Sequence, residues 1–168
     1  IDDIAMFRAY WPITSMERLT LELIFWTGAR ISDAIRLGEG MVTGDNNPDG
    51  GGWLAFRQDK TGGEVFIPFR RDLPDFAEAF ATDLVFLHEA IAAQADRHMT
   101  FIVTRAGASK SPKSISQWFA AKARKAGVKG KSAHGLRKAR AEILIESGAT
   151  VAQAAAWTGH DDYRMLAY

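Results

Sequence analysis

The chain of 168 residues contains no cysteine, and this absence excludes disulfides, thiolate catalysis and cysteine-based zinc sites. No apolar run approaches the ~18 residues of a membrane-spanning helix, so no contact with a membrane is expected. The first residues, Ile1-Asp2-Asp3-Ile4, include no basic segment and so do not resemble a signal peptide. An initiator methionine is also lacking, and we expect the chain to be a piece of a longer protein. These absences fit a cytoplasmic location.

Acidic residues are missing from a long stretch in the second half of the chain. The formal net charge is only +1, yet no Asp or Glu occurs between residues 97 and 141. The basic residues of this stretch are Arg97, Arg105, Lys110, Lys113, Lys122, Arg124, Lys125, Lys129, Lys131, Arg137, Lys138 and Arg140. Such an asymmetry indicates one face that binds a polyanion, and an ordinary solvated basic surface is the alternative.

The apolar pattern predicts a mainly α fold with a small antiparallel β-sheet, an α+β domain that spans residues 1–168. The length suffices for one domain with a substantial core. Two β-prone runs, 53–56 and 65–68, flank a turn-rich segment that contains Gly62-Gly63, which predicts a hairpin. Apolar positions at helical spacing predict helices over 15–27, 31–37, 72–93, 111–126, 133–147, 150–157 and from 161 onward, and the helix over 72–93 can break near residues 81–83.

Two arginines and a histidine stand where they can bind a phosphodiester. Guanidinium groups suit this anion because they are planar, always charged and bidentate. Arg30 follows the Thr27-Gly28 break, and Asp33 is expected to hold its guanidinium or to cap the local helix. His134 and Arg137 share one helix face because they are three residues apart. Taken singly, each is also compatible with an ordinary surface or ion-paired side chain.

Further candidate groups come from Lys60 and His160. Lys60 lies in the expected hairpin turn, where a mobile ammonium can protonate a leaving 5′-oxygen, although lysine is also common in turns. His160 follows Gly159 at the start of the last expected helix, where a structural role is the alternative. His88 and His98 lack a third ligand at suitable spacing, so neither a metal nor another cofactor is expected.

Taken in order, these residues resemble the conserved elements of the tyrosine recombinases, also called the phage integrase family. Arg30, Lys60, His134, Arg137 and His160 match the family's arginine, hairpin lysine, His-x-x-Arg and Gly-His elements. The resemblance covers nearly the whole chain. It implies the tyrosine-recombinase catalytic-domain fold, which is the fold of DNA breaking-rejoining enzymes.

The resemblance also implies a mechanism and partners. A tyrosine attacks the scissile phosphate and forms a 3′-phosphotyrosyl link, which conserves the bond energy, so that neither metal nor ATP is needed. A 5′-hydroxyl then reverses the attack. Family members recombine double-stranded DNA as homotetramers and usually carry a separate N-terminal core-binding domain, which we expect to be absent from this chain.

The position of the nucleophile departs from the family pattern. Tyr168 follows His160 by eight residues, whereas the family spacing is usually one residue longer, and one residue is ~100° of helix rotation. Met165-Leu166 also resembles the apolar pair that precedes the tyrosine. The nucleophile is therefore expected at Tyr168 or at the residue that follows it, and Tyr163 is less suited.

Two other functions remain open at this stage. The first is a truncated or decayed integrase that acts only as a DNA-binding module. The second is a relaxation enzyme like the type IB topoisomerases, which share the fold and most of the site. The compact length and the Gly-His element favour a site-specific recombinase over a topoisomerase.

Overall fold

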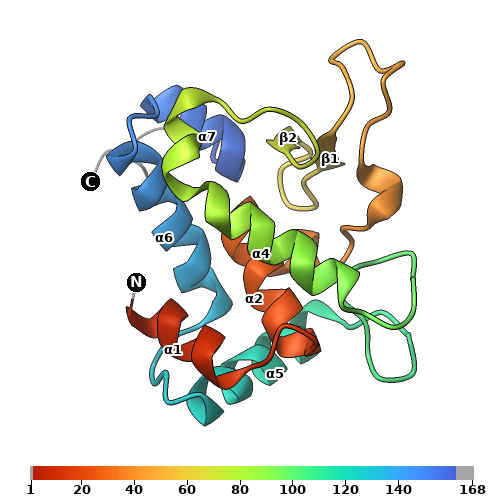
Figure 1. Ribbon diagram of the computed structural model, residues 1–168, viewed down its shortest axis with the longest axis vertical. Coiled ribbons are helices and arrows are strands. Elements are labelled where there is room, and N and C mark those ends of the chain that lie inside the picture. The colour runs from red at the N-terminus through yellow and green to blue at the C-terminus, as the bar shows by residue number, and fades with distance from the viewer. Residues whose placement is uncertain (1, 162–168) are drawn as a thin grey trace.

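Helix α2 (Met16–Thr27) runs through the middle of the computed structural model, which describes residues 2–161 (Figure 1). Ten of its twelve residues are buried, as expected for a helix that is apolar on nearly every side. The side chain of Ser15 caps its start by accepting from the backbone N–H of Arg18. Gly28, with a φ of 62°, ends it in the left-handed conformation that favours glycine.

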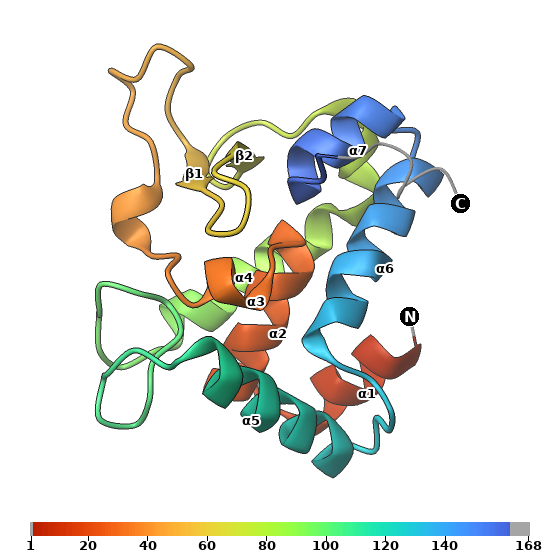
Figure 2. The same ribbon diagram turned by 180° about the vertical axis from the view of Figure 1, so that it is seen from behind.

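The other helices surround α2 (Figures 1 and 2). Helices α4 (Ala81–Ala92) and α6 (Ala133–Glu146) both pack against it, and α7 (Val151–Thr158) packs against α6. Helix α5 (Pro112–Lys125) contacts α2, α6 and the short α3 (Ile31–Ala34). No helix within residues 2–161 is long and apolar enough to cross a membrane.

A two-stranded antiparallel sheet completes the fold and confirms the predicted α+β class. Strands β1 (Trp53–Arg57) and β2 (Glu64–Pro68) pair so that Leu54 faces Ile67 and Phe56 faces Val65. These four side chains are buried, which fixes the register because a one-residue slip would expose them. The sheet contacts α7, and the indole of Trp26 donates to the carbonyl of Pro68 at 2.9 Å.

The predicted helix over 72–93 is wrong in its first part. Pro74 is extended, with φ −66° and ψ 151°, and a 3₁₀ segment, η2 (Asp75–Phe80), precedes α4. Tertiary packing explains the difference. Ala77 and Phe80, three residues apart, are both buried, and the ring of Phe80 lies 5.9 Å from that of Trp157.

Three smaller differences concern helices at the edge of the core. Helix α3 ends at Ala34, so it is shorter than the predicted 31–37. Helix α1 (Asp2–Tyr10) was not predicted, and its Phe7 stacks on Phe119 with ring centroids 5.4 Å apart. A second short 3₁₀ turn, η1 (Glu39–Met41), precedes the long loop before β1.

A buried ion cluster joins α1, α2, α4 and α6. Arg140 is fully buried, and its guanidinium donates to Asp83 at 2.6 Å and to the carbonyl of Phe25 at 2.6 Å. Asp83 also accepts from Arg8, which in turn donates to Glu22. Arg140 is therefore not part of the basic surface that the sequence suggested, because it fastens α6 to α4 and to the end of α2.

Candidate active site

The site begins where α6 passes the ends of α2 and α7, and Arg137 joins all three helices. Its side chain is 3% exposed. One guanidinium nitrogen, Nη1, donates to the carbonyl of Gly28 at 2.7 Å and also to the carbonyl of Thr158. The other, Nη2, is buried and has no hydrogen-bond partner among the described residues. A buried donor without a partner is rare, and Nη1 of Arg140 is another such donor among the described residues.

A hollow of about 260 Å³ lies beside Arg137. Its walls come from the α2–α3 junction, from α5 and from the start of α6, which lie on the side of the molecule seen in Figure 2. The lining residues are Ala29, Arg30, Ile31, Ser32, Ser116, Ser132, Ala133, His134 and Arg137. Three residues of the predicted site, Arg30, His134 and Arg137, therefore share one hollow.

The electrostatics of this hollow favour an anion. Burial, together with the positive charge of Arg30, lowers the pKa of Arg137 to about 10, which still leaves it protonated at neutral pH. Among residues 2–161, neither Arg30 nor Arg137 is in an ion pair with a carboxylate. Two guanidinium groups thus repel each other here, and a bound anion would relieve that repulsion.

Arg30 is held by an amide and not by the expected carboxylate. Its Nη1 donates to Oε1 of Gln58 at 2.5 Å. The carboxylate of Asp33 accepts instead from Arg36 at 2.6 Å and from the backbone N–H of Asp59 at 2.8 Å. Neither expected role of Asp33 is therefore seen, because it does not hold Arg30 and the start of α3 has no side-chain cap. Asp33 instead connects α3 to the hairpin turn through its hydrogen bond with Asp59. The sequence alone did not identify Gln58 as a residue of the site.

His160 is connected to Arg137 through Thr158, whose carbonyl accepts from Arg137 and whose hydroxyl contacts the imidazole. The Thr158 hydroxyl donates to the carbonyl of Ala154, so its oxygen accepts from Nδ1 of His160 at 2.6 Å. This network assigns the proton to Nδ1 and leaves Nε2 as an acceptor in the neutral ring. Burial and the positive charges of Arg137 and Arg30 lower the pKa of His160 to about 4, so the imidazole is neutral at pH 7.

Lys60 is exposed on the turn between β1 and β2. The turn is closed by hydrogen bonds between Gln58 and Gly63 and between Gly62 and Gln58, at 2.8 and 2.9 Å. Because the backbone N–H of Asp59 donates a hydrogen bond to Asp33, the turn that carries Lys60 is held near Arg30. Tyr168, Tyr163 and the helix expected from residue 161 onward lie outside the described residues.

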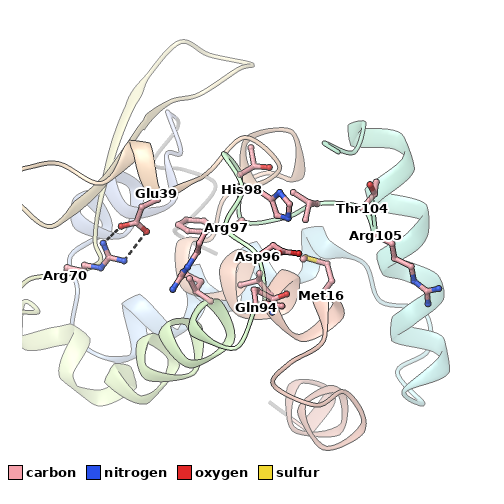
Figure 3. A pocket seen from close by; sticks show the side chains of 15 residues that line it. Met16, Glu39, Arg70, Gln94, Asp96, Arg97, His98, Thr104 and Arg105 are labelled. Carbon is pink, nitrogen blue, oxygen red and sulfur yellow. Dashed lines mark hydrogen bonds and ion pairs between the residues drawn. The ribbon is translucent and has the colours of Figure 1, made fainter. Parts of the chain in front are cut away.

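A larger hollow, of about 550 Å³, lies elsewhere and contains none of the predicted site residues (Figure 3). The segment 94–105 forms much of its wall. Glu39 and Arg70 form an ion pair at its edge, and this hydrogen bond lowers the pKa of Glu39. Arg97 and Arg105 also line this hollow, and neither is in an ion pair among the described residues.

Five of the twelve basic residues in the acid-free stretch are buried or ion-paired. Arg137 and Arg140 are buried, and three lysines pair with carboxylates from elsewhere: Lys122 with Glu17 at 2.9 Å, Lys131 with Asp3, and Lys138 with Glu142. Trp118 is half-buried, and its ring centroid lies 4.1 Å from the ammonium of Lys110. Within residues 2–161, no cluster of three or more His, Asp or Glu side chains has the arrangement of a metal site.

Several solved structures share this fold. A lambda integrase (75–356) dimer bound to a COC′ core site superposes with a TM-score of 0.72 and 20% identity, covering 98% of this chain and 54% of that one. The lambda integrase catalytic core gives 0.68 and 21%, covering 96% and 91%. XerH recombinase bound to difH gives 0.62 and 15%, covering 98% and 46%.

The chain spans about half the length of the DNA-bound lambda integrase chain. No curated protein sequence matches it. The sequence model of the phage integrase family matches residues 2–168, which is almost the entire chain. The fold, the paired arginines and this match lead to one conclusion: the chain belongs to the phage integrase family.

Proposed function

We propose that this chain is the catalytic domain of a site-specific DNA recombinase that cleaves and rejoins strands through a 3′-phosphotyrosyl intermediate. The observation that carries the proposal is the pair of guanidinium groups, Arg30 and Arg137, beside His134 in one hollow without a carboxylate partner among the described residues. A phosphodiester supplies the negative charge that this arrangement lacks. The non-bridging oxygens gain charge in the transition state, so fixed guanidinium groups favour that state over the ground state.

Each step of the proposed cleavage can be given to a named group. A phenol oxygen, from Tyr168 or the residue after it, forms a bond to phosphorus while the bond from phosphorus to the 5′-oxygen breaks. The ammonium of Lys60 gives its proton to the leaving 5′-oxygen. The phenol proton passes to an imidazole, and neutral His160 with an unprotonated Nε2 is chemically suited to accept it. Attack by a 5′-hydroxyl on the phosphotyrosine reverses these transfers.

The proposed partner is double-stranded DNA, bound by a homotetramer of the protein that carries this domain. The proposal draws on the solved relatives, which include a lambda integrase dimer on a core site and a lambda integrase tetramer on a Holliday junction. Strand exchange between two duplexes requires four cleavages, which four copies of one active site supply.

A covalent-trapping assay tests this function. The purified protein that carries this domain, with the residue that follows Tyr168 included, is incubated with a nicked suicide duplex of its recombination site. On this duplex, cleavage releases a short fragment that carries the 5′-hydroxyl, which prevents religation. We expect an adduct that survives denaturant and is lost when Arg137 is replaced by alanine. DNA binding with no adduct from the unaltered protein would instead identify a binding module. Relaxation of plasmids without recombination would identify a topoisomerase.

A further inference from the structure

Gln58 is a buried amide at the point where three parts of the site meet. Its side chain is 4% exposed, although it directly precedes an exposed turn. Its backbone N–H and carbonyl close the turn that carries Lys60. Its side-chain oxygen accepts from Nη1 of Arg30. A buried glutamine is uncommon, and this one uses both its backbone and its side chain on the site.

The amide also lies flat against Gly159, the residue before His160. A Cβ atom at Gly159 would lie 2.5 Å from Oε1 and 2.7 Å from Nε2 of Gln58, closer than atoms can approach. Gly159 has a φ of 69°, so both its conformation and its contact with Gln58 favour glycine. The amide therefore connects Arg30, the Lys60 turn and the turn before His160.

We propose that Gln58 is a positioning residue that holds the guanidinium of Arg30 beside that of Arg137 and sets the Lys60 turn against His160. This inference rests on the proposed function, because it assigns Gln58 a role in the same phosphate site. Gln58 acts through Arg30 and need not touch the DNA.

The chemistry of an amide suits this role better than that of a carboxylate. Arg30 lies near the positive charge of Arg137, and without an acceptor its flexible side chain turns toward solvent. A carboxylate would hold it by an ion pair but would cancel the charge intended for the phosphate. The neutral oxygen of Gln58 holds the guanidinium and leaves its full charge to the substrate.

The test separates the hydrogen bond from the packing. Gln58→Met fills nearly the same space against Gly159 but offers no comparable acceptor to Arg30, whereas Gln58→Glu keeps the acceptor and adds a negative charge. Gln94→Met is the matched control, because Gln94 is a partly buried glutamine that donates to the carbonyl of Ala90 far from the site. Thermal unfolding checks that each variant folds.

Two readouts are compared. The first is the single-turnover rate of covalent adduct formation on the nicked suicide duplex at saturating DNA. The second is the ¹⁵N–¹H signal of Arg30 Nε in the free protein, assigned by its loss in Arg30→Lys. We expect Gln58→Met to lower the rate by roughly tenfold to 100-fold, since ~1 Å of misplacement can cost about 100-fold. It is expected to shift or broaden the Arg30 signal, and Gln94→Met is expected to do neither.

The outcomes distinguish this inference from the proposed function. If the unaltered protein forms no adduct, the proposed function fails, and the Arg30 signal still decides whether Gln58 holds Arg30. If the unaltered protein cleaves but Gln58→Met cleaves equally fast, the positioning role is wrong. An unchanged Arg30 signal in Gln58→Met also overturns it. A Gln58→Glu variant that cleaves at the unaltered rate contradicts the argument from charge.

Discussion

Arg137 has a structural and a proposed catalytic task in the same side chain. Its Nη1 satisfies the carbonyls of Gly28 and Thr158, while Nη2 remains without a partner in the described part of the chain. We expect Arg137→Ala to reduce adduct formation by roughly 100-fold or more, as when a donor to a transition-state oxyanion is removed. DNA affinity is expected to change little, and the free energy of unfolding to fall by about 1–3 kcal/mol for the unsatisfied carbonyls.

Arg137→Lys is expected to be nearly as damaging, because one ammonium cannot serve two carbonyls and a phosphate with the geometry of a guanidinium. Lys138→Ala is the control, since Lys138 is the next residue on α6 and its side chain is 75% exposed. Cleavage at the unaltered rate by both Arg137 variants would show that Arg137 does not bind the scissile phosphate.

His160 predicts a pH dependence of stability. The pKa of His160 is about 4 in the folded protein, against an ordinary value of 6.5. Between pH 4 and 6.5, the imidazole is therefore protonated in the unfolded chain but neutral in the folded one. The free energy of unfolding is therefore expected to fall as the pH drops from about 6.5 toward 4, with no contribution above that range. Denaturant unfolding of the unaltered protein and of His160→Gln measures it. Identical pH profiles for the two proteins would rule out this contribution.

At the scale of elements, local signals in the sequence predicted those helices whose ends depend on local chemistry. Ser15 and Gly28 bound α2, and the capping box of Thr150 and Gln153 begins α7, as the residue types suggest. The segment before α4 could not be predicted in this way. Its 3₁₀ form results from the packing of Phe80 between tryptophans that are distant in sequence.

The buried ion cluster makes a prediction about how the elements are held together. Asp83 on α4 accepts from Arg8 on α1 and from Arg140 on α6. Asp83→Ala would leave the fully buried Arg140 without its carboxylate, and we expect the free energy of unfolding to fall by about 3–5 kcal/mol.

Glu64→Ala is the control for this prediction, because the pair of Arg57 and Glu64 is 70% and 64% exposed and is expected to contribute less than ~1 kcal/mol. Chemical denaturation measures both variants. Equal losses in the two would mean that the cluster does not hold α1, α4 and α6 together.

For the whole molecule, the sequence predicted the fold class and the family, but not the detailed surroundings of the site. Arg30 and Arg137 are 107 positions apart, and the order of motifs indicated that they belong together. The order of motifs did not reveal Gln58, because a glutamine in a hairpin is not distinctive in the sequence. Its role becomes visible only when the structure places its amide against Gly159. The charge count likewise could not show that Arg140 is buried, since only the fold supplies Asp83.

The distribution of charge predicts which lysines contact DNA. Lys113 is exposed, has no ion pair among the described residues, and lies one turn from Ser116 at the hollow. Lys122 is already paired with Glu17. We expect the logarithm of the DNA affinity to fall steeply with the logarithm of the salt concentration. Lys113→Ala is expected to reduce the slope of this plot by about 0.9, the value for one phosphate contact. Lys122→Ala is expected to leave the slope nearly unchanged. Salt titrations check this, and a larger effect at Lys122 would place the DNA on another face.

In the proposed mechanism, Arg30, His134, Arg137 and His160 surround a phosphate that a tyrosine near the end of this chain attacks. The most direct measurement is peptide mapping of the covalent DNA adduct by mass spectrometry. We predict a DNA 3′-phosphate on the phenol of Tyr168 or of a tyrosine immediately after it. An adduct on Tyr163 or on a serine, or one joined to a 5′-phosphate, would contradict this mechanism.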